Sequence, residues 1–156
     1  MKVFELLEEK FILTDFKSFK KEDLINELID LHAGNDKVNN LDDVRNAVLE
    51  REKIMSTGVG KGFAIPHGKT NSIKDIIAAF GKTTHPIDYD ALDGEPVHLV
   101  FLLVGKDTLV SKHIKSLSRI SRLMNKDDFR QKLIEAESKS EILKTFEEEE
   151  KNYNDV

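Results

Sequence analysis

Histidine is the residue type of this chain best suited to chemistry near neutral pH. The chain has five: His32, His67, His85, His98 and His113. His67 stands out, because Pro66 and Gly68 flank it at the end of a glycine-rich stretch, residues 58–68. A rigid proline before the imidazole and a glycine without a side chain after it hold the ring still and leave its far side open. Neutral imidazole is a good nucleophile, and this arrangement suits one that must meet a bulky partner.

Other kinds of site find little support. The chain has no cysteine, which removes thiol nucleophiles, disulfides and cysteine-based zinc sites. No HExxH motif or other helical histidine–carboxylate cluster is present, so we expect no metal site. The glycines of residues 58–62 precede a predicted strand, whereas nucleotide-binding glycine loops precede a helix. No GxxxxGK[ST] or GxSxG motif occurs either, so we expect no cofactor and no serine nucleophile.

Each candidate residue also has an ordinary structural interpretation. From the residues alone, a histidine in a turn explains His67 as well as a nucleophile does. Arg51 falls at the predicted end of a helix, where a cation interacts favourably with the helix dipole. His113 falls at a helix start, where one satisfied hydrogen bond would account for it. Surface or half-exposed positions are expected for the remaining histidines, His32, His85 and His98.

The composition limits the class of protein. A chain of 156 residues, 39% apolar and 34% charged, is long enough to bury a core in one compact domain. The net charge of -5 argues against nucleic-acid binding, which needs a basic surface. No apolar run approaches the roughly 18 residues of a membrane span, and acidic residues interrupt the first nine positions, unlike a signal peptide. We therefore expect a cytoplasmic protein that does not insert into the membrane.

Strand and helix signals alternate along the chain. Short apolar segments predict strands, at residues 11–13, 63–65, 76–81 and 97–104. The last of these is apolar on both faces apart from His98, so it should lie mid-sheet with helices on each side. Helical spacing and capping residues predict five helices, which start at Ser18, Asn40, Ser111, Asn125 and Ser138. The alternation predicts an α/β fold with a mixed β-sheet flanked by helices on both sides, an α/β sandwich.

Two of these helices should direct a polar residue toward the sheet. Arg51 continues the apolar stripe of Val44 and Val48 at helical spacing, and His113 opens a second stripe that runs to Met124. Both stripes must pack on the sheet that carries His67, so Arg51 and His113 can converge on its end. We expect residues 1–156 to form a single domain, with residues 147–156 as a frayed acidic tail.

The segment Gly-Lys-Gly-Phe-Ala-Ile-Pro-His-Gly, residues 60–68, resembles the active-site signature of a known family. The family is the enzyme IIA domains of the phosphoenolpyruvate-dependent sugar phosphotransferase system (PTS), in the fructose–mannitol class (type 2). That class also contains the nitrogen-regulatory IIA proteins. The resemblance covers nearly the whole chain and includes residues 48–52, 86–97 and 113–120, in the family's order and spacing. The loop of residues 105–110 departs from it.

The resemblance implies a phosphoryl carrier. It implies that His67 accepts a phosphoryl group from the phosphocarrier protein HPr and passes it to a IIB component, for uptake of a sugar or polyol of the fructose, mannitol or galactitol kind. Arg51 would supply a cationic fork, and His113 would donate to a phosphoryl oxygen or fix the His67 ring. Because the donor is a phosphoprotein, no nucleotide or magnesium site is needed. An apolar rim with few charges should surround His67, with Phe63, Ile65 and residues 58–62 supporting or forming it.

Two alternatives remain. The chain is either a transport component or a regulatory nitrogen-type IIA protein whose phosphorylation state controls its protein partners. A related domain that no longer transfers phosphate is a third possibility. The intact Pro66-His67-Gly68 segment, together with Arg51 and His113, argues against that third possibility.

Overall fold

Strand β6 (Val97–Gly105) lies in the middle of the sheet, where its nearly unbroken apolar sequence places it. The computed structural model describes residues 2–152 and forms one six-stranded mixed sheet. Its other strands are β1 (Ile12–Leu13), β2 (Gly58–Gly60), β3 (Phe63–Ala64), β4 (His67–Lys69) and β5 (Ile77–Ile87). β6 pairs antiparallel with β5 on one side and parallel with β3 and then β4 on the other. β1 joins β5 in parallel, and β2 joins β3 antiparallel.

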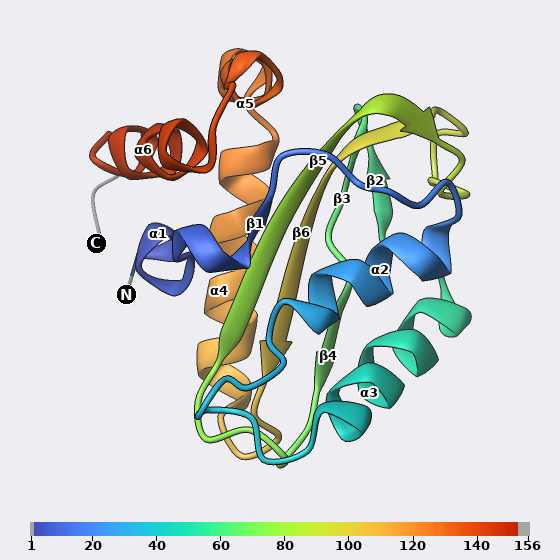
Figure 1. Ribbon diagram of the computed structural model, residues 1–156, viewed down its shortest axis with the longest axis vertical. Helices are drawn as coiled ribbons and strands as arrows, with labels where there is room; N and C mark the ends of the chain where they lie inside the picture. The colour runs from blue at the N-terminus through green and yellow to red at the C-terminus, as the bar shows by residue number, and fades with distance from the viewer. Residues whose placement is uncertain (1, 153–156) are drawn as a thin grey trace.

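Helices cover both faces of this sheet (Figure 1), which confirms the predicted α/β architecture. They are α1 (Val3–Leu6), the 3-10 helix η1 (Glu9–Phe11), α2 (Lys21–Asp30), α3 (Leu41–Ile54), α4 (Val110–Met124), α5 (Asp127–Glu135) and α6 (Lys139–Glu150). Alternate side chains of β6 from Leu99 to Leu103 pack with α1, α4, α5 and α6, and those from Val100 to Val104 pack with α2 and α3. The central strand is therefore buried on both faces, as an all-apolar strand requires. In the described part of the chain, no helix combines the length and apolarity that a membrane span needs.

The predicted helix starts are partly confirmed. Asn40 and Ser138 cap their helices, each side chain accepting the backbone N–H three residues further on. Ser18 does not cap α2, which begins at Lys21, because the Glu27 carboxylate accepts the backbone N–H of Ser18 and holds it outside the helix. The other two starts also differ from the predicted Ser111 and Asn125, since α4 begins at Val110 and α5 at Asp127.

The prediction that His32 lies at the surface is wrong. Its side chain is 1% exposed and stacks on Phe11. Nε2 donates to the Ala78 carbonyl oxygen at 2.8 Å, and Nδ1 accepts from the Asn35 side-chain amide. Burial lowers the pKa of His32 to about 4, so this ring is a neutral, fully bonded part of the core.

The expected frayed tail begins later than residue 147, because α6 extends to Glu150. The Glu150 side chain is fully buried, and its carboxylate accepts the backbone N–H groups of Val3 and Phe4 and an N–H of Arg119. This carboxylate stabilises the N-terminus of α1 and joins it to α6. Residues 153–156 lie outside the described residues.

The glycine-rich stretch forms a tight hairpin between β2 and β3. Gly60 and Gly62 adopt positive φ values of 131° and 84°, with Lys61 between them at 57°. The prediction of one strand at residues 63–65 is modified. β3 ends at Ala64, and a second segment, β4, starts at His67. His67 therefore lies at the beginning of a short strand that continues along the same edge of β6.

Gly68 determines how closely α3 approaches β4. A Cβ atom at this position would lie 2.9 Å from the backbone carbonyl carbon of Ala47 and 3.0 Å from the backbone nitrogen of Val48. The glycine thus faces the α3 backbone, and only a residue without a side chain permits this contact. The contact lies on the Gly68 side of the strand, which α3 covers, whereas the His67 side chain lines an open cavity.

We predict that Gly68→Ala destabilises the fold by roughly 1–3 kcal/mol, because helix backbone atoms cannot move aside as a flexible side chain can. The free energy of unfolding from urea titration measures the effect. Gly34→Ala is the control, because that position has a positive φ of 80° but nothing within 4 Å of the added methyl group. A Gly68→Ala loss no larger than the Gly34→Ala loss would contradict the close-packing interpretation.

Candidate functional site

His67 lies half-buried at the first position of β4, between α3 on one face of the sheet and α4 on the other. Its Nδ1 is 2.8 Å from the carbonyl oxygen of Ile65, two residues earlier. A carbonyl oxygen can only accept, so Nδ1 carries the proton in the neutral ring and Nε2 keeps its lone pair. Pro66, which lies between Ile65 and His67, has no backbone N–H that could compete with the ring for a hydrogen-bond acceptor. The chain therefore selects the tautomer of its own histidine.

The surroundings of His67 favour the neutral ring. Burial is the largest cause that lowers the pKa of His67, and the positive charge of Arg51 lowers it further. The hydrogen bond to Ile65 and the negative charge of Glu52 act in the opposite direction and are outweighed. A neutral imidazole with an available Nε2 is the nucleophilic form.

A cavity of about 460 Å³ lies in front of His67. Its walls are side chains and backbone of α3, β4, the loop after β6 and α4, namely Ala47, Arg51, His67, Gly68, Lys69, Asp107, His113 and Leu117. The structure thus brings Arg51 and His113 to the same cavity as His67, although the three residues are far apart in the sequence. Lys69 and Asp107 also line it, and sequence reasoning did not single them out.

His113 is buried in the first turns of α4, with its ring centroid 6.0 Å from that of His67. Its Nδ1 has no hydrogen-bond partner among the described residues and lies over Gly105, where an added Cβ would be 2.2 Å away. Burial is the main cause that lowers the pKa of His113 to about 4, and repulsion from His67, once that ring is protonated, and from Lys69 acts in the same direction. An orphaned buried N–H is rarer than an orphaned acceptor, so we assign the proton to Nε2 on the opposite edge of the ring.

Arg51 is held at the end of α3 by the chain that follows the helix. Its Nη1 donates to the backbone carbonyl oxygen of Met55 at 2.9 Å. This bond satisfies a carbonyl group beyond the helix end, in keeping with the predicted interaction of a cation with the helix C-terminus. No carboxylate forms an ion pair with Arg51 within residues 2–152, so its charge remains available to an anion in the cavity.

Glu52 is a residue of this region that the sequence analysis missed. It is 8% exposed, and its carboxylate accepts from the backbone N–H of Thr57 at 2.7 Å and from the Tyr89 hydroxyl at 3.1 Å. The Thr57 hydroxyl also bonds to it, and the Lys21 ammonium group lies 2.7 Å away. These contacts fix the segment between α3 and β2, which includes the Met55 carbonyl that holds Arg51. No periodic pattern reveals such a network, because its members come from four separate segments.

The prediction of few charges around His67 is wrong for the cavity itself, because Arg51, Lys69 and Asp107 line it. Phe63 and Ile65 are 0% and 5% exposed, so they support the site from the core and cannot contact a partner. Of residues 58–62, Val59 is an exposed apolar side chain. Exposed apolar side chains also occur at the end of α3 (Ile54, with Met55 just beyond it) and at the start of α4 (Val110 and Ile114, with Leu109 just before it), the helices that carry Arg51 and His113.

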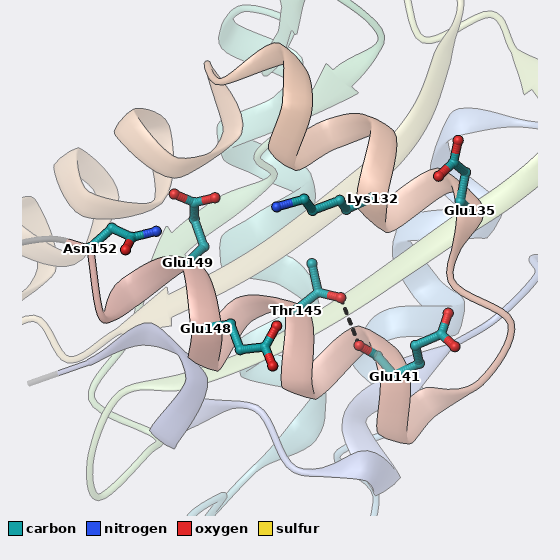
Figure 2. Close-up of a pocket in the computed structure, with 7 residues that line it drawn as sticks. All are labelled: Lys132, Glu135, Glu141, Thr145, Glu148, Glu149 and Asn152. Atoms are coloured by element: carbon teal, nitrogen blue, oxygen red, sulfur yellow. Dashed lines mark hydrogen bonds between the residues drawn. The ribbon is translucent and has the colours of Figure 1, made fainter.

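A second hollow, of about 490 Å³, lies between α5 and α6 (Figure 2). Its lining is predominantly acidic and consists of Lys132, Glu135, Glu141, Thr145, Glu148, Glu149 and Asn152. The Thr145 hydroxyl is already engaged, since it donates to the backbone carbonyl oxygen of Glu141 at 2.8 Å. Four carboxylates beside one lysine repel a phosphate group, and no histidine is present. The His67 cavity is therefore the candidate active site.

The fold and this cavity define an α/β protein that presents a histidine at the edge of a mixed sheet, beside an arginine and a second histidine. The family described as "Phosphoenolpyruvate-dependent sugar phosphotransferase system, EIIA 2" matches residues 5–149. The chain belongs to this family, as its sequence predicted. The family is one of phosphotransfer components, and the match runs from within α1 to the last turn of α6.

Individual relatives agree with this assignment. The "PTS system fructose-specific EIIABC component" of Bacillus subtilis is 37% identical over 151 residues, which cover 97% of this chain and 24% of that protein. This chain therefore spans about a quarter of that relative. The crystal structure of the nitrogen regulatory protein IIA-Ntr from Neisseria meningitidis has a TM-score of 0.86 and 30% identity, covering 92% of this chain and 98% of that one. The complex of enzyme IIAMTL and phosphorylated enzyme IIBMTL from Escherichia coli matches with a TM-score of 0.77 and 18% identity, covering 91% and 97%, which shows the shared fold.

We predict that the protein loses stability as the pH falls from about 6.5 to about 4. His32 and His113 stay neutral in the folded chain because each has a pKa of about 4, whereas the unfolded chain protonates both near pH 6.5. The unfolded state therefore binds more protons in this window, and the free energy of unfolding decreases as the pH is lowered.

Urea titrations at several pH values measure this slope. Carboxylates add to the same trend at lower pH, so the decisive comparison is with His113→Asn, which removes one of the two histidines whose pKa is about 4. The slope between pH 6.5 and 4 should be shallower in the variant. An identical slope would show that His113 is not held neutral in the folded chain.

Proposed function

We propose that this protein is a phosphoryl carrier of the phosphoenolpyruvate-dependent sugar phosphotransferase system. In this proposal His67 accepts a phosphoryl group from phospho-HPr and passes it to a IIB component, for uptake of a sugar or polyol. The observation that carries the proposal is the hydrogen bond from His67 Nδ1 to the Ile65 carbonyl oxygen, which leaves the Nε2 lone pair for the cavity. Membership of the EIIA type 2 family supports it independently.

Phosphoryl transfer to His67 needs little more than a neutral ring with a free Nε2. The lone pair of His67 Nε2 forms a bond to phosphorus while the bond to the donor's nitrogen breaks, and the donor nitrogen recovers its electron pair. Nδ1 keeps its proton throughout and donates it to the Ile65 carbonyl oxygen, so no proton has to leave the nucleophile. The loose transition state of phosphoryl transfer is stabilised mainly by positioning and by donors to its oxygens. Arg51 supplies a cationic fork and His113 an Nε2–H donor.

The exposed apolar residues on α3 and α4 suit a partner that docks over the cavity. Ile54 and Ile114 are 80% and 59% exposed on the two helices that carry Arg51 and His113. A carrier must release its partners between transfers, so a small and transient interface fits this surface. The solved complex between enzyme IIAMTL and phosphorylated enzyme IIBMTL supports a IIB component as the acceptor. In this proposal the protein exchanges phosphoryl groups with HPr in the cytoplasm. Residues 1–156 act as a single domain.

A regulatory role is the second candidate. The likeness to IIA-Ntr from Neisseria meningitidis, with 30% identity over 92% of this chain, favours it. Both roles keep His67 as the phosphorylated residue, and they differ in the next step. Onward transfer to a IIB component encoded beside this chain indicates transport. A phosphorylation that is never passed on, but changes binding to another protein, indicates regulation.

We predict that phosphoenolpyruvate, enzyme I and HPr together place one phosphoryl group on this protein, at His67. The label should be lost in acid and retained in alkali, as a phosphohistidine requires. Mass spectrometry and ³²P incorporation measure the result. His67→Ala should abolish the label, and His85→Ala, which removes a half-buried histidine outside the cavity, should leave it unchanged. Full labelling of His67→Ala would overturn the proposed function.

We further predict that Arg51 and His113 accelerate a transfer that His67 can perform slowly without them. Removing one donor to developing phosphoryl charge typically slows a reaction by roughly 10²–10³. Arg51→Ala and His113→Ala should show such losses in initial rate. Gly105→Ala should resemble His113→Ala, because its methyl group would displace the His113 ring. His98→Ala is the control, since His98 is outside the cavity. Parent-like rates in both Arg51→Ala and His113→Ala would show that neither assists His67.

A further inference from the structure

Lys69 shares a strand face with His67. The two are alternate residues of β4, so their side chains leave the strand on the same side, whereas Gly68 between them faces α3. In the parallel pairing with β6, Lys69 lies opposite Gly105, the residue on which the His113 ring rests. The register therefore places Lys69 on the face of β4 that carries His67 and opposite the residue beneath His113, and Lys69 lines the same cavity as both histidines.

The charge of Lys69 acts inside this cavity. It is one of the causes that lower the pKa of His113, after burial and the charge of His67. Within residues 2–152 Lys69 forms no ion pair, and Asp107 is the only acidic residue among those that line the cavity. Arg51 is tied to the Met55 carbonyl oxygen at the α3 side. Lys69 is thus a second cation at the cavity, on the strand that carries the nucleophile itself.

We propose that Lys69 is a further phosphoryl-binding residue, whose ammonium group donates to an oxygen of the phosphoryl group on His67. This role rests on the proposed function of His67. A phosphoryl group offers three oxygens, and Arg51, the Nε2–H of His113 and Lys69 approach the cavity from three different elements. An ammonium group on a flexible stem can follow the phosphoryl group as it moves from the donor's nitrogen to Nε2. Charge-assisted hydrogen bonds of this kind are the stronger class.

The test compares Lys69→Met with Lys69→Arg and with Lys74→Met. Lys74 is an exposed lysine on the same connection to β5 and does not line the cavity, so its substitution changes the net charge equally. Initial rates of phosphorylation by phospho-HPr should fall roughly 10-fold or more in Lys69→Met, recover in Lys69→Arg and remain unchanged in Lys74→Met. Equal rates in Lys69→Met and the parent would overturn the proposal.

A second readout detects the contact itself. A neighbouring cation favours the dianionic phosphoryl group, so ³¹P NMR should show a higher phosphoryl pKa in phosphorylated Lys69→Met than in the parent or in Lys74→Met. A purely structural role of Lys69 would leave this titration unmoved, and that result would also overturn the proposal. The two failures are distinct: an unlabelled parent chain would overturn the function of His67, and with it this role. A labelled parent that Lys69→Met matches would overturn the role of Lys69 alone.

Discussion

The site depends on one hydrogen bond, from His67 Nδ1 to the carbonyl oxygen of Ile65. An isolated neutral imidazole exchanges its proton between two nitrogens, and only the nitrogen without the proton can attack phosphorus. The bond removes this ambiguity within three residues of chain, because Pro66 interrupts the strand and lets the ring turn back onto the carbonyl before it. Burial and the charge of Arg51 lower the pKa of the same ring and keep it neutral. The nucleophile is thus prepared before any partner arrives.

Two helices, α3 and α4, carry the other candidate residues of the site to the His67 ring. Glycines make their close approach possible. Gly68 allows the backbone of α3 to contact β4, and Gly105 allows the His113 ring of α4 to lie directly on β6. The Glu52 carboxylate fixes the chain that leaves α3, which in turn holds Arg51 through a backbone carbonyl. The stability of the sheet and the geometry of the cavity are therefore linked, since the contacts that pack the helices also place the candidate donors.

The features that depend on local sequence pattern could be predicted from the sequence. The apolar run of β6 predicted a central strand, and the helical spacing that placed Arg51 and His113 on inward stripes predicted residues that line one cavity with His67. Features that depend on hydrogen-bond partners distant in the sequence were not predicted. His32 looked like a surface residue because its acceptor, the Ala78 carbonyl, lies on another element, and Glu150 looked like part of a polar tail because its donors are at the other end of the chain. For Phe63 and Ile65 the sequence left open whether they support or form the rim, since apolar character does not distinguish core from contact surface, and both are buried.

The tautomer of His67 tests this account most directly. Long-range ¹H–¹⁵N NMR of the ¹⁵N-labelled protein at neutral pH distinguishes a protonated ring nitrogen from one with a lone pair, and after phosphorylation it shows which nitrogen is coupled to phosphorus. The account predicts a protonated Nδ1 and an unprotonated Nε2 in the resting protein, with phosphorus joined to Nε2 afterwards. A resting ring protonated at Nε2, or a phosphoryl group found on Nδ1, would contradict it.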